Sequence, residues 1–164
     1  MSRLVTPPGV KRGQIVQRRS ATEKESTVTT NAQPFTSLKK AVDQIRHQHV
    51  AAVNAGDAEV ATNLFGPEGI FLPPGQPALE GTPAIRVWFT HVFANFRVVG
   101  FGLQPRTVEQ HGDVIIEHGN WQATFQPKDA SPGLPAGGTY LTVYARLSDG
   151  SVRIIRDTFN GMPG

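Results

Sequence analysis

The chain has 164 residues, which predicts one domain of ordinary size with a real hydrophobic core. It contains no cysteine, which excludes disulfides, a thiolate nucleophile and a cysteine metal site, and suits a reducing, cytoplasmic location. No apolar run approaches about 18 residues, and the start lacks the apolar core of a secretory signal. We therefore expect neither a membrane span nor a membrane partner.

The net charge of +3 is unevenly distributed. Residues 1–35 contain six Lys or Arg and two Glu, which leaves the rest of the chain at −1. This pattern predicts a mobile basic arm over 1–35 and a near-neutral pocket domain over 36–164. The arm could also pack on a partner subunit or bind an acidic surface. Because the folded part has no basic stripe, nucleic acid is not an expected partner.

The first predicted elements are helices. Apolar residues at three- and four-residue spacing predict a helix over 34–55. Its apolar face contains Leu38, Val42, Ile45, His49 and Val53. Gly56 fits the C-cap of this helix, and Asp57 fits the N-cap of a short second helix over 58–65.

A third helix follows a short strand over 70–72. Thr82 and Pro83 suit the start of that helix, which ends near Asn95. We expect the apolar side chains of this helix to face the core: Ile85, Trp88, Phe89, Val92 and Phe93.

After Asn95 the hydrophobic period changes to two, which predicts strands. The four predicted strands cover 96–110, 113–126, 138–147 and 152–160. Gly100 and Gly102 indicate a bulge in the first of them. Helices followed by an antiparallel meander predict an α+β fold, with the helices packed on one face of a curved sheet.

The last two strands form a predicted hairpin around Asp149 and Gly150. A two-residue turn there places Thr142 opposite Asp157 and Tyr144 opposite Ile155. One face then contains Tyr140, Thr142, Tyr144, Ile155, Asp157 and Phe159. The other contains Leu141, Val143, Ala145, Leu147, Val152, Ile154 and Thr158. Since both faces are largely apolar, we expect one to meet the helices and the other to form a homodimer through the outer sheet face.

Two carboxylates lie among these apolar positions. Glu117 shares a strand face with Ile115 and Trp121. It is either a rim carboxylate in water or a group with a raised pKa that can act as acid or base. Asp157 is an ion-pair partner of a neighbouring arginine such as Arg153 or Arg156, a rim carboxylate, or a pocket carboxylate.

Several other chemistries lack support in the sequence. His47 and His49 lie about 200° apart around a helix, so they cannot chelate one metal, and we expect no metal site. His49 falls on the apolar stripe, where a core histidine is more common than a catalyst. The chain has no Gly-x-Ser-x-Gly, no P-loop and no complete GxGxxG, so we expect no cofactor.

Six short segments, taken in order, carry a family resemblance. They are residues 52–57 (AVNAGD), 72–75 (LPPG), 80–85 (EGTPAI), 117–121 (EHGNW), 138–143 (GTYLTV) and 156–160 (RDTFN). Over about residues 38–161 the chain resembles the SnoaL-like and ketosteroid-isomerase-like proteins of the nuclear-transport-factor-two superfamily. It looks most like the SgcJ/EcaC-like or calcium/calmodulin-kinase-association-like branch.

The resemblance implies a cone-shaped, cystatin-like α+β fold, in which a curved antiparallel sheet and three N-terminal helices enclose a pocket. It also implies carboxylate acid–base chemistry on a hydrophobic ligand. The first hypothesis is a cofactor-free isomerase, cyclase or dehydratase for a small hydrophobic, oxygenated molecule. The alternative is a non-catalytic dimeric module that binds a ligand or assembles, so whether the domain is an enzyme stays open.

The predicted site follows from these hypotheses. The catalytic candidates are Asp157 as general base, with Glu117 and Tyr144 supplying or steadying a proton. The candidate ligand-binding residues are Trp121, Tyr140, His49, Trp88, Phe89, Phe93 and Phe159. The two hypotheses differ on whether Asp157 and Glu117 reach one enclosed cavity.

Overall fold

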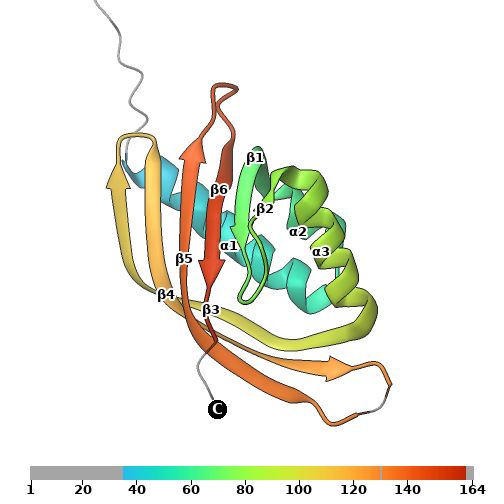
Figure 1. Cartoon of the computed structure of the whole chain (residues 1–164). Coiled ribbons are helices and arrows are strands. Elements are labelled where there is room, and N and C mark those ends of the chain that lie inside the picture. The colour runs from blue at the N-terminus through green and yellow to red at the C-terminus, as the bar shows by residue number, and fades with distance from the viewer. Residues whose placement is uncertain (1–34, 130, 162–164) are drawn as a thin grey trace, which may run out of the picture. The chain divides into compact units, whose positions relative to one another are not determined.

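A computed structural model describes residues 35–129 and 131–161 of the chain (Figure 1). The predicted arm over 1–35 lies outside these residues except for its last position, and it remains a prediction. The helices are α1 (Phe35–Ala55), α2 (Ala58–Asn63) and α3 (Gly81–Asn95). The strands are β1 (Phe65–Leu72), β2 (Leu79–Glu80), β3 (Phe96–His111), β4 (Val114–Pro127), β5 (Leu134–Arg146) and β6 (Val152–Phe159).

The strands of the domain form one curved, unclosed sheet in the order β2-β1-β6-β5-β4-β3. All neighbours are antiparallel except β1 and β6, which pair in parallel. The long strands β3, β4 and β5 bend strongly along their length (Figure 1). The predicted α+β fold, with N-terminal helices on a curved sheet, is confirmed.

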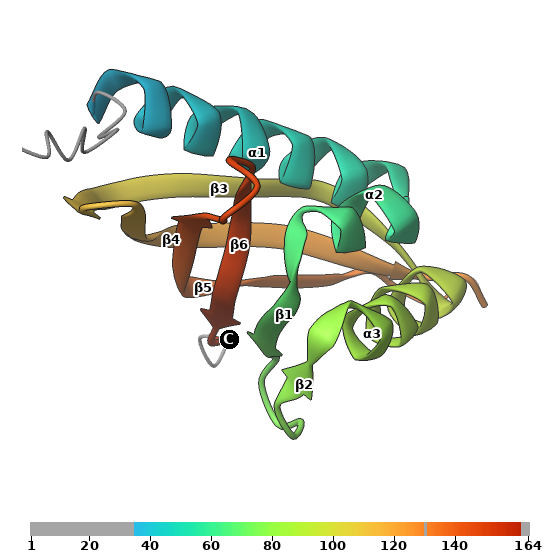
Figure 2. The same cartoon turned by 90° about the horizontal axis from the view of Figure 1, so that it is seen from above.

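Helix α1 crosses the inner face of the sheet, whereas α2 and α3 lie toward the β1 end (Figure 2). The predicted apolar face of α1 is buried in the core: Leu38, Val42, Ile45, His49 and Val53. No helix in the described ranges is long and apolar enough to cross a membrane.

Of the helix caps predicted between α1 and α3, those at Gly56 and Asp57 are confirmed and the one at Thr82 is wrong. Gly56 has a positive φ of 70°, and the side chain of Asp57 accepts a hydrogen bond from Val60 N at 2.9 Å, as predicted for the two caps. Helix α3 instead begins at Gly81, and Thr82 is not its cap. Strand β2 runs directly into the helix because Gly81, with a φ of 78°, turns the chain there.

Two strands are longer than their sequence patterns predicted. Strand β1 begins at Phe65, which pairs with Ile154 of β6 ahead of an irregularity in the ladder. Strand β5 begins at Leu134, which pairs with Phe125, so part of the predicted loop is strand. Backbone pairing with a neighbour extends both strands beyond their apolar cores. The predicted bulge in β3 is confirmed between Val99 and Gly102.

The register of the β5–β6 hairpin corrects the predicted outer face. Thr142 pairs with Asp157 as predicted, but a bulge next to Tyr144 makes that residue pair with Ile154 rather than with Ile155. The extra residue in β6 turns the side chains before it to the opposite face. Val152 and Ile154 are therefore buried in the core, and their predicted place in a subunit interface was wrong.

Candidate functional site

An apolar cavity lies between the inner face of the sheet and the helices α1 and α3, with a volume of about 60 Å³. The seven side chains predicted to bind a ligand all lie on its wall: His49, Trp88, Phe89, Phe93, Trp121, Tyr140 and Phe159. Ligand pockets typically measure about 300–1,000 Å³, so this conformation admits only a compact molecule.

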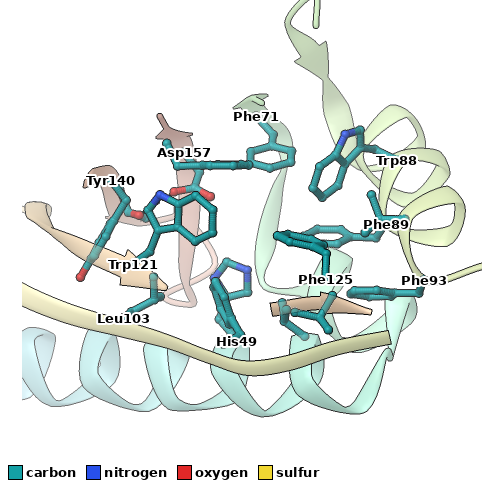
Figure 3. Close-up of a pocket in the computed structure, with 16 residues that line it drawn as sticks. His49, Phe71, Trp88, Phe89, Phe93, Leu103, Trp121, Phe125, Tyr140 and Asp157 are labelled. Carbon is teal, nitrogen blue, oxygen red and sulfur yellow. Dashed lines mark hydrogen bonds between the residues drawn. The ribbon is translucent and has the colours of Figure 1, made fainter. Parts of the chain in front are cut away.

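Aromatic rings from α3 and from the strands β1, β3, β4, β5 and β6 build the wall of the cavity (Figure 3). Phe71 of β1 stacks on Phe89 of α3 with a centroid distance of 5.9 Å and an interplanar angle of 8°. Trp121 of β4 meets Phe159 of β6 edge to face at 5.1 Å. The cavity therefore presents π faces and ring edges, and few polar groups, to a ligand.

Among the described residues that line this wall, Asp157 alone has a carboxyl group. Its side chain accepts a hydrogen bond from Thr142 Oγ1 at 2.6 Å, and the residue is only 7% exposed. The predicted alternative, an ion pair with Arg153 or Arg156, is wrong. Both guanidinium groups donate to neighbouring backbone carbonyls instead. Burial raises the pKa of Asp157 to about 7, against the opposing effect of the Thr142 hydrogen bond.

His49 reaches the cavity from α1, on the opposite side from the sheet (Figure 3). Its imidazole contacts the rings of Phe65, Phe89 and Phe101, and the described residues give it no hydrogen bond. Burial lowers the pKa of His49 to about 4, so the ring is neutral at physiological pH. The predicted core histidine is thus also a cavity wall residue.

The end of β6 holds Trp121 in place. The indole Nε1 donates to the backbone oxygen of Asn160 at 2.8 Å, and the Asn160 side chain accepts hydrogen bonds from the backbone and hydroxyl of Thr139. Gly138 makes room for this contact, because a Cβ there would lie 2.0 Å from the Asn160 oxygen. The indole therefore has a fixed orientation in the cavity wall.

Glu117 lies next to the cavity but does not line it. Its carboxylate binds Arg46 of α1 and accepts hydrogen bonds from Tyr140 at 2.9 Å and Tyr144 at 3.4 Å. We call Arg46, Glu117, Tyr140 and Tyr144 the buried ion-pair cluster. Glu117 is 0% exposed, so the predicted alternative of a rim carboxylate in water is wrong.

Opposing effects act on the charge of Glu117 in the buried ion-pair cluster. Burial raises the pKa of Glu117, and the Arg46 guanidinium and the hydroxyls of Tyr140 and Tyr144 oppose this effect. Burial beside this carboxylate also raises the pKa of Tyr140 and of Tyr144. Both tyrosines therefore stay protonated and act as hydrogen-bond donors.

The structure thus brings the predicted site residues into two groups. Asp157 lies in the cavity, whereas Glu117 and Tyr144 lie behind its wall. Tyr140 joins the two groups, because its ring faces the cavity and its hydroxyl points away toward Glu117 (Figure 3).

Sequence reasoning missed Arg46, Phe71 and Thr142. Thr142 could have been found from its predicted pairing with Asp157, and a search for a cation on α1 that could pair with a buried Glu117 could have pointed to Arg46. Among residues 35–129 and 131–161, no three His, Cys, Asp or Glu side chains are grouped so that they could hold a metal ion.

Residues 47–155 match the model of the SnoaL-like domain, so the chain belongs to the SnoaL-like family. The narrower branch suggested by the sequence stays a prediction. No curated protein matches the chain.

Solved structures share the fold at low sequence identity. A nuclear transport factor 2 (NTF2-like) superfamily protein from Salmonella enterica serovar Typhimurium is 17% identical, with a TM-score of 0.71 over 80% of this chain and 95% of that one. A ketosteroid isomerase-like protein from Erwinia carotovora atroseptica is 18% identical, with a TM-score of 0.68 over 76% and 96%. An NTF2-like protein with a cystatin-like fold from Novosphingobium aromaticivorans is 17% identical, with a TM-score of 0.64 over 79% and 84%.

Proposed function

We propose that this domain binds a compact, largely apolar, oxygenated molecule in its cavity and acts on it as a cofactor-free isomerase, cyclase or dehydratase. Asp157 is the acid–base group. The observation that carries the proposal is its position, as a buried carboxyl on an otherwise apolar wall without an ion-pair partner among the described residues.

The chemistry of Asp157 suits proton transfer. A pKa of about 7 means that the protonated and the ionised carboxyl are both populated near neutral pH. A general acid or base is most effective when its pKa lies near the working pH. Thr142 donates a hydrogen bond to Oδ1 of this carboxyl and the backbone of Thr158 donates a second, so the group is held in place on the cavity wall.

The other predicted catalytic residues have an indirect role in this proposal. Glu117 and Tyr144 are positioning residues, because their polar groups are engaged within the buried ion-pair cluster. They hold the ring of Tyr140 against the cavity through its hydrogen bond to Glu117. Membership of the SnoaL-like family supports a pocket function, and the name of the isomerase-like neighbour agrees with the proposed class of reaction.

The test is Asp157→Asn, compared with Glu68→Gln, which changes an exposed carboxylate on β1. Candidate substrates come from a thermal-shift screen of small hydrophobic ketones, alcohols and phenols, and turnover is then followed by chromatography. We expect Asp157→Asn to lower kcat by about 100- to 10,000-fold, the usual contribution of a positioned acid or base. Full turnover in Asp157→Asn, with the fold intact, would contradict the catalytic role.

A second candidate function is a dimeric binding or assembly module. One observation favours it: Leu141, on the outer face of the sheet, is 40% exposed, next to the half-buried Val143. Association of two copies over this face would cover Leu141 and Val143. The oligomeric state in solution tests this candidate independently of turnover.

A further inference from the structure

Most hydrogen-bond donors on the cavity wall already have a partner within the protein, so they are not free to bind a ligand. Three hydrogen-bond donors on the wall are already engaged: Thr142 Oγ1 by Asp157, Tyr140 Oη by Glu117 and Trp121 Nε1 by the Asn160 carbonyl. Two wall donors, the N–H of the neutral His49 ring and Trp88 Nε1, have no hydrogen bond among the described residues, so an anionic ligand, or an oxyanion formed during a reaction, would find few free donors there.

The cavity wall also has no positive charge of its own. Of the described residues that line it, none is Lys or Arg. The partly buried Arg46 on α1 is neutralised by Glu117 and by Asp43, whose Oδ1 lies 2.5 Å from Arg46 Nη2. An anion in this cavity would therefore lose its hydration without gaining a counter-charge.

The wall does offer two features that attract positive charge. One is the Asp157 carboxyl, for which the described residues supply no cation. The other is the set of aromatic faces beside it: Phe71 pairs with Asp157 across β1 and β6, and Phe159 follows two residues later on β6. A cation over such rings gains about 0.5–2 kcal/mol, and more when water is excluded.

We propose that the cavity is selective for a small organic cation, a protonated amine on a compact apolar group, which pairs with Asp157 among the aromatic rings. This selectivity narrows the proposed function, on whose use of the Asp157 cavity it rests: the oxygenated ligand would also carry a protonated amine. It assigns that site to ligands, or reacting groups, that carry positive charge. A neutral isostere binds less well, and an anion is rejected.

The inference predicts a proton-linked affinity. The amine pairs with the ionised carboxyl, so its binding strengthens as pH rises through the pKa of Asp157, about 7. The other titratable groups around the carboxyl are His49, Tyr140, Tyr144 and Glu117. His49 on α1 is neutral, Tyr140 and Tyr144 on β5 stay protonated, and Glu117 on β4 is paired with Arg46.

The experiment uses three probes of nearly equal shape and a size that suits the small cavity: isobutylamine, isobutanol and isobutyrate. Binding is measured by NMR titration of the full chain at pH 6 and pH 8. We expect the amine to bind at least tenfold more tightly than the alcohol at pH 8, and isobutyrate to bind most weakly. The amine itself stays protonated at both pH values, so its affinity should fall about tenfold at pH 6 as Asp157 takes up its proton.

Two variants locate the effect. Asp157→Asn should bind the amine no better than the alcohol and show no pH dependence, whereas Glu68→Gln, an exposed carboxylate on β1, should behave as wild type. The wild-type pH series stands on its own if the Asp157 variant does not fold. Equal affinity for amine and alcohol at pH 8, preference for isobutyrate, or no binding of the amine to the wild type would overturn the inference.

These experiments distinguish a failure of the cation site from a failure of the proposed function. Amine selectivity through Asp157 without turnover of any screened compound would remove the proposed catalysis and leave the cation site. Turnover that depends on Asp157, without amine selectivity, would remove only the cation site.

Discussion

The domain contains two buried carboxyl groups on its inner sheet face, and they differ in their surroundings. Glu117 is surrounded by a guanidinium and two hydroxyls, so both oxygens of its carboxylate have a partner. Asp157 accepts hydrogen bonds from the Thr142 hydroxyl and the Thr158 backbone, has no cation beside it among the described residues, and faces aromatic rings. Burial alone therefore does not identify a reactive group. A buried carboxyl that the fold has already paired is structural, and one that it has left unpaired is available to a ligand.

The largest expected effect on stability comes from breaking the paired region. Arg46→Ala leaves the Glu117 carboxylate buried without a cation, and we expect it to lower the free energy of unfolding by about 3–5 kcal/mol. Urea denaturation measures this loss. Asp43→Asn is the control, because this partly exposed partner of Arg46 should contribute about 1 kcal/mol or less. A loss as small in Arg46→Ala as in Asp43→Asn would contradict the distinction between the two carboxyl groups.

The unpaired carboxyl should show itself in the pH dependence of stability. The pKa of Asp157 is about 7 in the folded protein, against 3.8 for an ordinary Asp, so the native state binds more protons between these values. Stability contributed by this group is therefore full at low pH and falls as pH rises from about 4 to 7, by up to about 4 kcal/mol. Asp157→Asn should remove this fall and melt at a higher temperature than wild type at pH 8. An unchanged melting curve at pH 8 would show that the carboxyl is paired after all.

His49 should make the free energy of unfolding rise with pH over part of the same pH range. Its folded pKa of about 4 lies below the ordinary value of 6.5, so the unfolded state binds more protons and stability rises with pH between these values, by about 3 kcal/mol. The two slopes partly cancel in wild type, where Glu117, whose pKa is also raised, adds to the slope of Asp157. His49→Phe should therefore make the fall with pH steeper, as measured by thermal melts from pH 4 to pH 8. The same slope in His49→Phe and wild type would mean that this imidazole is not buried.

Tyr140 connects the two regions, and Gly119 gives it room. A Cβ at Gly119 would lie 2.3 Å from Gln104 O and 2.8 Å from Tyr140 Cε1. We expect Gly119→Ala to shift the ring and to lower the free energy of unfolding by about 1–3 kcal/mol, measured by urea denaturation. Gly102→Ala, where a Cβ would meet nothing within 4 Å, is the matched control. Equal stability of the two variants would mean that Tyr140 is free to move.

The smallest effect on the free energy of unfolding is expected on the outer face of the sheet, away from both Glu117 and Asp157. Leu141→Glu should change the stability of the folded monomer by about 0.5 kcal/mol or less, because the side chain is partly in water. It should nevertheless dissociate the proposed dimer, which sedimentation velocity at micromolar concentration would reveal. Val87→Glu, 70% exposed on α3, is the control that should leave the dimer intact. A wild-type chain that sediments only as a 17.7 kDa monomer would end the dimer proposal.

The sequence by itself determined most of the architecture, because the signals involved are local. Helical spacing predicted the buried face of α1, and the change to a period of two after Asn95 predicted the long strands. The cap residues Gly56 and Asp57 act within a few positions of the chain, so they could be read directly. The pairing of Thr142 with Asp157 also followed from the hairpin turn, although the turn did not decide between a pocket carboxylate and the alternatives for Asp157.

Only the tertiary structure decided which face each side chain of β6 takes and which buried polar groups are paired. The bulge beside Tyr144 turned Val152 and Ile154 into the core, and no local pattern in β6 marks that extra residue. The partner of Glu117 lies 71 positions away on α1 and is set by how the helix crosses the sheet. Spacing along a chain specifies which face a side chain takes, but not which distant group meets it there. Packing therefore decided that Glu117 is paired and that Asp157 is left facing the cavity.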